Sequence, residues 1–220
     1  MYALPVASES VHSFRAHYRA TEIGAYYTGW GHFALTSTVC LGTVAFAIAR
    51  LAAPTPLEWL TVPATFLLAN LVEYWGHRGP MHHRTGPKKV YERHTLQHHR
   101  FFTHESMAYE GSRDFKMVLF PPVLLGFFLG AIAAPIGALL FVLATPNIAW
   151  LYVATAMGYF LTYEWLHFAY HLPTSSPLAR LPGLAFLRRH HTLHHDPAQM
   201  GKANFNITFP VADLLFGTRR

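Results

Sequence analysis

Four long apolar runs constrain the fold of this chain more strongly than any other feature of its sequence. They cover residues 33–50, 57–76, 117–144 and 148–166, and a helix that crosses a membrane needs about 20 such residues. Only 13% of the chain is charged, whereas an ordinary soluble domain carries about 25% charged residues. The pattern predicts an all-α membrane protein with about four transmembrane helices in two hairpins.

Proline marks the turns of the hairpins and interrupts one of the runs. The short segments 52–56 and 145–147 contain proline and separate the two runs of each hairpin. The third run contains Pro121, Pro122 and Pro135. Because proline lacks a backbone donor and clashes with the preceding helical turn, we expect this run to be kinked or partly re-entrant.

The distribution of positive charge predicts how the helices are oriented. Two hairpins place both termini and the polar loop 77–116 on the same side of the membrane. Of the 17 lysines and arginines, all but Arg50 fall on that side. Since positively charged loops are retained in the cytoplasm, we expect an integral, multi-pass membrane protein whose termini are both cytoplasmic.

The same reasoning divides the chain into parts. Residues 1–32 are expected to form an N-terminal cytoplasmic segment, and residues 33–220 a single membrane-embedded domain. Within this domain, the polar segments 77–116 and 167–220 should fold into a helical, histidine-rich cap on the cytoplasmic side. The orientation rule also explains the net charge of +6, so we expect no nucleic-acid partner.

Histidine is the residue type in this sequence that is best suited to bind a metal ion. Thirteen of the 16 histidines fall in the stretches 73–104 and 164–195, and none lies between residues 105 and 166. Imidazole is a good ligand for iron, zinc and copper. The single cysteine, Cys40, excludes an internal disulfide, a C-x-x-C pair and a cysteine-ligated iron–sulfur cluster.

The spacing of the histidines indicates a site for two metals. His167 and His171 are four residues apart and share one helical face. The pairs His94–His98 and His191–His194 could share a helical face in the same way. Gly79 and Pro80 should let the chain turn between His77 and His82. The adjacent pairs His98–His99 and His194–His195 point about 100° apart on a helix, so each pair suits two ions better than one. Ten positions fit two metals with about five ligands each: His77, His82, His94, His98, His99, His167, His171, His191, His194 and His195.

The remaining histidines and the nearby charges have more ordinary expected roles. His12, His17 and His32 are interpreted as surface or hydrogen-bonded core residues. Four residues beside the ligands are candidates for orienting them: Glu73, Glu164, His83 and His190. The two glutamates could equally be polar residues at the membrane interface, and the two histidines surface or hydrogen-bonded core residues. Six basic residues could contact an anionic head group, or simply follow the orientation rule: Arg78, Arg84, Lys88, Lys89, Arg188 and Arg189.

Several histidine motifs are spaced along the chain in a fixed order: EYWGHRGPMH, HTLQHH, HFAYH and RRHHTLHH, followed by the ending NFNITFPVADLLFGT. Together they resemble the fatty acid hydroxylase/sterol desaturase superfamily of membrane di-iron oxygenases. The resemblance covers roughly residues 57–220 and is nearest to the fatty acid 2-hydroxylase branch. It implies two iron ions on the ten histidines, O2 as co-substrate, and hydroxylation or desaturation of a lipid, with a fatty acyl chain expected first. One departure concerns the second motif, in which three residues separate His94 from His98 where that branch has two, and Thr95 takes the place of the family ligand.

Several related activities fit the same residues. Carotenoid ring hydroxylases and sterol or alkane oxidases of the superfamily are the enzymatic alternatives, and a membrane metal binder or transporter is the non-enzymatic one. A transporter should carry ionisable ligands inside its spans, whereas these histidines lie at the ends of the spans and beyond. No flavin- or nicotinamide-binding motif is present, so a cytochrome b5- or ferredoxin-type donor with its reductase should supply the electrons.

Overall fold

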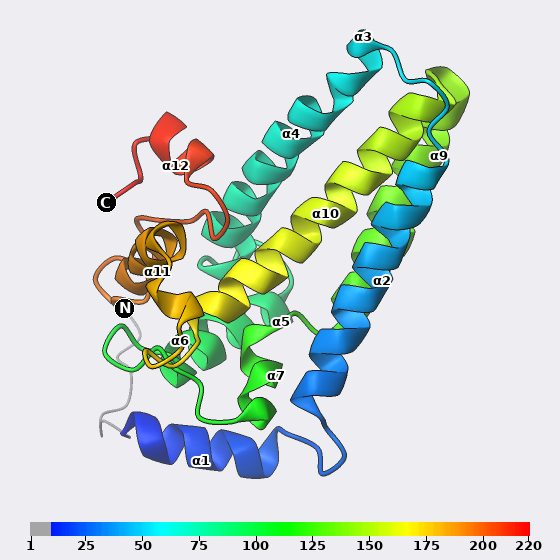
Figure 1. Ribbon diagram of the computed structural model, residues 1–220. Coiled ribbons are helices and arrows are strands. Elements are labelled where there is room, and N and C mark those ends of the chain that lie inside the picture. Colours follow the sequence, from blue (N-terminus) through cyan, green and yellow to red (C-terminus); the bar gives the residue numbers. More distant parts are fainter. Residues whose placement is uncertain (1–9) are drawn as a thin grey trace.

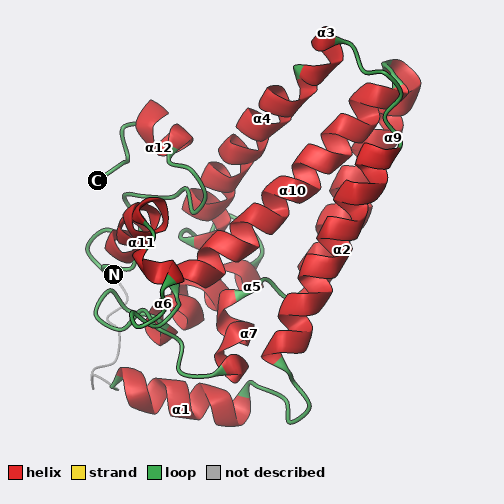
Figure 2. Cartoon of the chain, viewed as in Figure 1, coloured by secondary structure: helices red, strands yellow, loops and turns green. Residues whose placement is uncertain are grey.

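The computed structural model describes residues 10–220, and every regular element in that range is a helix (Figure 2). The predicted all-α class is therefore confirmed. Residues 1–9 of the predicted N-terminal segment lie outside the described residues. The longer helices are α1 (Val11–Thr21), α2 (Gly29–Ala49), α4 (Thr61–Gly76), α8 (Pro122–Phe127) with η4 (Phe128–Ala133) and α9 (Ala134–Leu143), α10 (Pro146–Tyr170) and α11 (Pro182–His194).

Shorter elements connect these helices. They are α3 (Pro56–Trp59), η1 (His77–Met81), α5 (Lys88–Tyr91), η2 (Glu92–His98), α6 (His99–Phe101), η3 (Ser112–Asp114), α7 (Phe115–Val118), η5 (Leu178–Arg180) and α12 (Val211–Leu215). Figure 1 shows an elongated arm of long helices that carries α3 and α9 at its far end. Most short elements, together with α1 and α11, gather at the opposite end.

Helix α10 is the centre of the arm and packs against α2, α4 and α9. Thirteen of its side chains are buried, among them Tyr163, Glu164 and His167. Close packing against α9 depends on Gly137, because a Cβ at this position would lie 2.7 Å from a methyl group of Val153. The far ends of the hairpins are joined by Glu58, which accepts a hydrogen bond from the Thr145 hydroxyl at 2.6 Å.

Two of the four predicted spans are long and apolar enough to cross a membrane. They are α2 and the continuous helix Pro122–Leu143, and only 22% and 17% of their most apolar windows are buried inside the molecule. Val123 and Val142 are more than 70% exposed. Because a core helix of a soluble domain buries its apolar residues, this exposure indicates an apolar surrounding for the arm.

The third run, predicted to be kinked or partly re-entrant, forms one continuous helix over most of its length. Its first residues belong to α7, and a continuous helix begins at Pro122, where the missing backbone donor of proline costs nothing. The π-helical turn η4 ends two residues before Pro135, which lies in the first turn of α9. A widened turn here places the proline where no regular helical hydrogen bond is lost.

Candidate metal centre

Ten histidines meet in two adjoining clusters at the end of the arm where the short elements gather. All ten side chains are buried, with at most 9% of any residue exposed. The first cluster contains His77, His82, His94, His99 and His194. The second contains His98, His171, His191 and His195, and His167 joins it through contacts of 3.3 Å with His98 and His171. The ten residues are the set that the sequence analysis selected.

The first cluster is built from pairs of histidines five residues apart. His77 and His82 bracket η1, and their Nε2 atoms lie 3.1 Å apart. His94 and His99 bracket most of η2, again with 3.1 Å between the Nε2 atoms. A π-helical turn bonds residue i to i+5 and so places residues five apart above one another. The helix therefore does not end at Gly79 and Pro80 but continues through them as a wider, π-helical turn.

The second cluster is built from pairs four residues apart on α-helical turns. His167 and His171 lie at the end of α10 with Nε2 atoms 3.3 Å apart. His191 and His195 lie at the end of α11 with Nε2 atoms 3.0 Å apart. Side chains at i and i+4 on an α-helix share one face, so ordinary helices are sufficient here.

Each adjacent pair is divided between the clusters. His99 and His194 belong to the first cluster, whereas their neighbours His98 and His195 belong to the second. The rings of His99 and His195 stack at the junction, with centroids 4.2 Å apart. The pairs His94–His98 and His191–His194, which the sequence suggested could share a helical face, do not share a cluster. The π-turn redirects His94 toward His99, and His191 pairs with the residue four positions later.

Backbone carbonyls fix the tautomers of five of the ten rings. In each case Nδ1 donates to a carbonyl oxygen at 2.5–2.9 Å. The pairs are His77 with Phe205, His98 with Met117, His171 with Met107, His194 with Ala203, and His195 with Phe102. Because a carbonyl only accepts, the proton lies on Nδ1 and the Nε2 lone pair is free to point into the cluster.

The separations within the clusters fit coordination of a metal ion. Neighbouring Nε2 atoms lie 2.8–3.3 Å apart. Two nitrogens bound at right angles to an ion, each about 2.1 Å away, would lie about 3 Å apart. Burial lowers the pKa of His98 to about 3 and that of His77 to about 4, so both rings are neutral near pH 7. Facing lone pairs on neutral rings are ready to receive a cation.

The loop 203–208 orients the first cluster. Ala203 and Phe205 present their carbonyls to two different histidines, and Asn204 between them adopts a left-handed conformation with φ of 59°. Asparagine tolerates this conformation better than most residues. The Asn204 side chain also donates to the His190 carbonyl at 3.0 Å, which connects the loop to α11.

Two carboxylates hold this loop in place. Asp213 accepts from the backbone of Phe205 at 3.0 Å and of Asn206 at 2.7 Å. Burial raises the pKa of Asp213, but hydrogen bonds from His190, Thr218 and these amides lower it more. Glu73 accepts from the backbone of Ile207 and Thr208. Glu73 thus supports the loop that orients His77 and does not contact a histidine of the clusters directly, as one of its two predicted roles would require.

Arg15 of α1 holds the loop that orients the second cluster. Its guanidinium is 2% exposed and donates to the Phe101 carbonyl at 2.8 Å, the Ser106 carbonyl at 2.7 Å and Glu110 at 2.8 Å. The same segment contains the carbonyls of Phe102 and Met107 that receive His195 and His171. This role was not predicted from the sequence, because an isolated arginine in an amphipathic segment gives little signal for it.

The other candidate residues lie outside the clusters. Among the described residues, Glu164 bonds to the Phe120 amide at 3.2 Å rather than to a ring. His83 is exposed, and its Nδ1 donates to the Arg78 carbonyl at 2.6 Å. His190 is buried, with Nε2 3.3 Å from Asp213. The core interpretation of His32 fits its contacts with the Tyr27 hydroxyl and the Phe120 carbonyl, while His12 and His17 are exposed.

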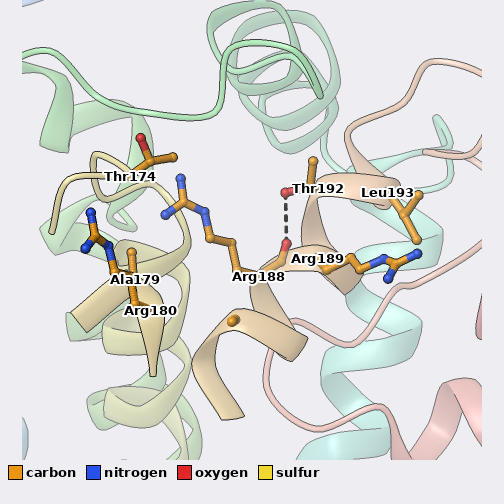
Figure 3. Close-up of a pocket in the computed structure, with 8 residues that line it drawn as sticks. Thr174, Ala179, Arg180, Arg188, Arg189, Thr192 and Leu193 are labelled. Carbon is orange, nitrogen blue, oxygen red and sulfur yellow. Dashed lines mark hydrogen bonds between the residues drawn. The ribbon is translucent and has the colours of Figure 1, made fainter. Parts of the chain in front are cut away.

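The basic candidates fall into two groups. In the first, Arg78 donates to the Tyr74 hydroxyl at 2.9 Å, Arg84 lies over the ring of Tyr91, and Lys88 pairs with Glu92 at 3.2 Å; Lys89 is exposed. In the second, Arg188 and Arg189 line a surface pocket on α11 (Figure 3).

Comparison with known proteins assigns the family. Residues 62–218 match the family model described as fatty acid hydroxylase, and the chain belongs to this family, an oxidoreductase family. The predicted superfamily is therefore confirmed. The fold is similar to the structure titled full-length Scs7p with only the hydroxylase domain visible, at a TM-score of 0.58 and 22% identity, covering 88% of this chain and 67% of that chain. No curated protein matches the sequence.

The division into clusters predicts distinct losses of metal. His194→Ala should empty the first cluster and His195→Ala the second, so each variant should retain about half of the metal or less. His83→Ala is the matched control, since His83 adjoins His82 but lies outside both clusters. Metal content per chain, measured by mass spectrometry of purified protein, should be unchanged in this control. An equal loss in all three variants would contradict the assignment.

Thr95 is predicted to position His82. Its hydroxyl donates to the Met81 carbonyl at 2.6 Å and lies 3.3 Å from Nδ1 of His82, so its oxygen can accept the proton of that ring. Thr95→Val keeps the shape but removes both bonds and should weaken metal binding at the first cluster by about 10–100-fold. Thr95→Ser should remain close to the unaltered protein. Competition with a chromogenic chelator measures both affinities, and equal values for Val and Ser would refute this role.

Proposed function

We propose that this chain is a membrane di-iron oxygenase that hydroxylates an aliphatic lipid, with a fatty acyl chain as the expected substrate. The observation that carries the proposal is the pair of adjoining five-histidine clusters in a member of the fatty acid hydroxylase family. Clusters of imidazole alone suit iron, zinc or copper, and the family favours iron. Each cluster would hold one ion.

The proposed reaction balances as R–H + O2 + 2 e⁻ + 2 H⁺ → R–OH + H2O. When bound, the two irons would supply the activation of O2 and the attack on an unactivated C–H bond, chemistry beyond the reach of side chains. The contribution of the chain is structural and electrostatic. Its carbonyls fix the ring tautomers, its buried loops hold the rings in register, and burial keeps water from the clusters.

The proposed topology places this chemistry at the membrane surface. We infer that α2, α4, the helix Pro122–Leu143 and α10 all cross the bilayer, with the clusters and both termini on the cytoplasmic side. An acyl tail would lie along the apolar arm with its reacting carbon near the clusters. Arg78 and Arg84, which follow His77 in the chain, are proposed to contact an anionic head group.

Labelling from the two sides of the membrane checks this topology. Leu57 is 76% exposed at the far end of the arm, and Ala198 is exposed just after α11. In a Cys40→Ala background, Leu57→Cys should react with an impermeant thiol reagent only from outside the cell, and Ala198→Cys only in inverted vesicles. Reaction of both positions from the same side would contradict four spans.

The activity itself is tested by product analysis. Membranes that contain the protein, supplied with isotopically labelled O2 and reductant, should yield lipids that carry one labelled oxygen atom in a hydroxyl group. The double variant His194→Ala/His195→Ala should yield none, because both clusters lose a ligand. Label in a carotenoid or a sterol would move the substrate to those classes. No labelled product in acyl lipids, sterols or carotenoids would reject the oxygenase function.

A further inference from the structure

The outer surface of α11 has an arginine-rich face that the two clusters do not use. A pocket of about 460 Å³ is lined by Arg180, Arg188 and Arg189, and a second of about 260 Å³ by Arg189, Arg219 and Arg220. Arg189 borders both pockets. In Figure 3, Arg188 extends toward Thr174 on the side of Arg180, whereas Arg189 extends toward Leu193. We call this surface the α11 arginine face.

The charge of this face is unbalanced. Within residues 10–220, none of its five arginines forms an ion pair with a carboxylate. Three basic residues elsewhere do form such pairs: Arg15 with Glu110 at 2.8 Å, Arg19 with Asp114 at 2.7 Å, and Lys88 with Glu92 at 3.2 Å. Five uncompensated arginines on one surface produce a positive potential that attracts an acidic partner.

Apolar side chains lie among these arginines. Leu181 is 54% exposed, Phe186 48% and Leu193 37%. Arg219 lies over the ring of Phe186, with 5.3 Å between its guanidinium carbon and the ring centroid. Arginine and aromatic residues are enriched in protein–protein interfaces, whereas lysine is depleted. The composition favours a protein partner, and the concave pockets can receive carboxylate side chains.

The face is also adjacent to the clusters. Helix α11 carries Arg188 and Arg189, and its buried residues His191 and His194 reach the clusters from the inside. A helix with its side chains is about 10–12 Å thick, so a partner docked here would be separated from the clusters by one helix. Figure 1 shows α11 at the end of the molecule opposite α3 and α9.

We propose that the α11 arginine face is the docking surface for a small acidic electron-transfer protein. This inference rests on the proposed function, which consumes two electrons per turnover. Two molecules of reduced donor would bind in turn, and each would be oxidised by one electron. Together with two protons, these electrons reduce one oxygen atom of O2 to water while the other enters the lipid.

Binding of a defined donor tests the proposal without requiring turnover. The probes are a soluble acidic cytochrome b5 domain and an acidic [2Fe–2S] ferredoxin, titrated onto the purified full chain in detergent at low and high salt. Arg189→Glu should weaken binding of the better probe by roughly tenfold at low salt, because it reverses a charge shared by both pockets. Arg189→Lys should stay within about threefold of the unaltered protein.

The control carries the same change at the far end of the arm. Arg50→Glu reverses a charge next to Phe46 at the end of α2 and should bind the probe like the unaltered protein. Equal affinity of Arg189→Glu and the unaltered chain, or affinity that salt does not reduce, would overturn the proposal. Arg189-dependent binding to phosphatidylserine vesicles, with no binding of either redox protein, would also overturn it and assign the face to the lipid surface.

Failure of the docking proposal can be separated from failure of the proposed function. A small chemical reductant can bypass the donor. If the unaltered chain makes labelled hydroxylated lipid with the chemical reductant but Arg189→Glu does not alter donor binding, only the docking proposal fails. If the unaltered chain makes no product with either source of electrons, the proposed function fails.

Discussion

The structure depends on the convergence of ten buried imidazole rings whose Nε2 atoms face one another, five of them with Nδ1 bonded to a backbone carbonyl. Neutral rings packed in this way leave acceptors opposite acceptors, and a buried acceptor without a partner costs about 1–3 kcal/mol. A cation in each cluster converts the unfavourable arrangement into a favourable one. The clusters therefore have the form of metal sites, and much of the surrounding structure holds their rings in place.

The support extends well beyond the rings. Carbonyls of Ala203 and Phe205 fix two rings of the first cluster, and they are placed by the left-handed Asn204 and by Asp213. Carbonyls of Phe102 and Met107 fix two rings of the second cluster, and they are placed by Arg15. Segments from both ends of the chain thus act on the same centre. The apolar arm, in turn, brings the ends of α4 and α10 together so that the histidines that follow each helix meet.

The sequence could reveal the ligands because their chemistry is local. Imidazoles four residues apart predict a shared helical face, and His167 with His171 meets that prediction. The five-residue spacing of His77 and His82 was harder, because nothing in Gly79 and Pro80 distinguishes a break from a π-helical turn. The same type of turn accommodates the extra residue between His94 and His98, the point at which the sequence departs from the family pattern.

Other features could not be read from the sequence because they depend on distant contacts. Glu73 lies close to His77 in the chain, yet its oxygens face the loop 207–208. Arg15 and Asp213 carry no local signal for the segments they hold. The apolar runs predicted the helices well, but length and hydropathy alone identify only α2 and Pro122–Leu143 as membrane-crossing. Of the remaining two helices, α4 has only 16 residues, and the apolar sequence of α10 is interrupted by tyrosines, tryptophans and Glu164.

Metal analysis of the purified protein tests the central claim most directly. The protein should be prepared in mild detergent from cells grown on iron-57, and its metal content and Mössbauer spectrum measured together. Two adjoining clusters predict about two irons per chain, each bound by histidine, and a spectrum that shows the two irons to be coupled. A single metal per chain, or zinc that iron cannot replace in an active form, would contradict the account.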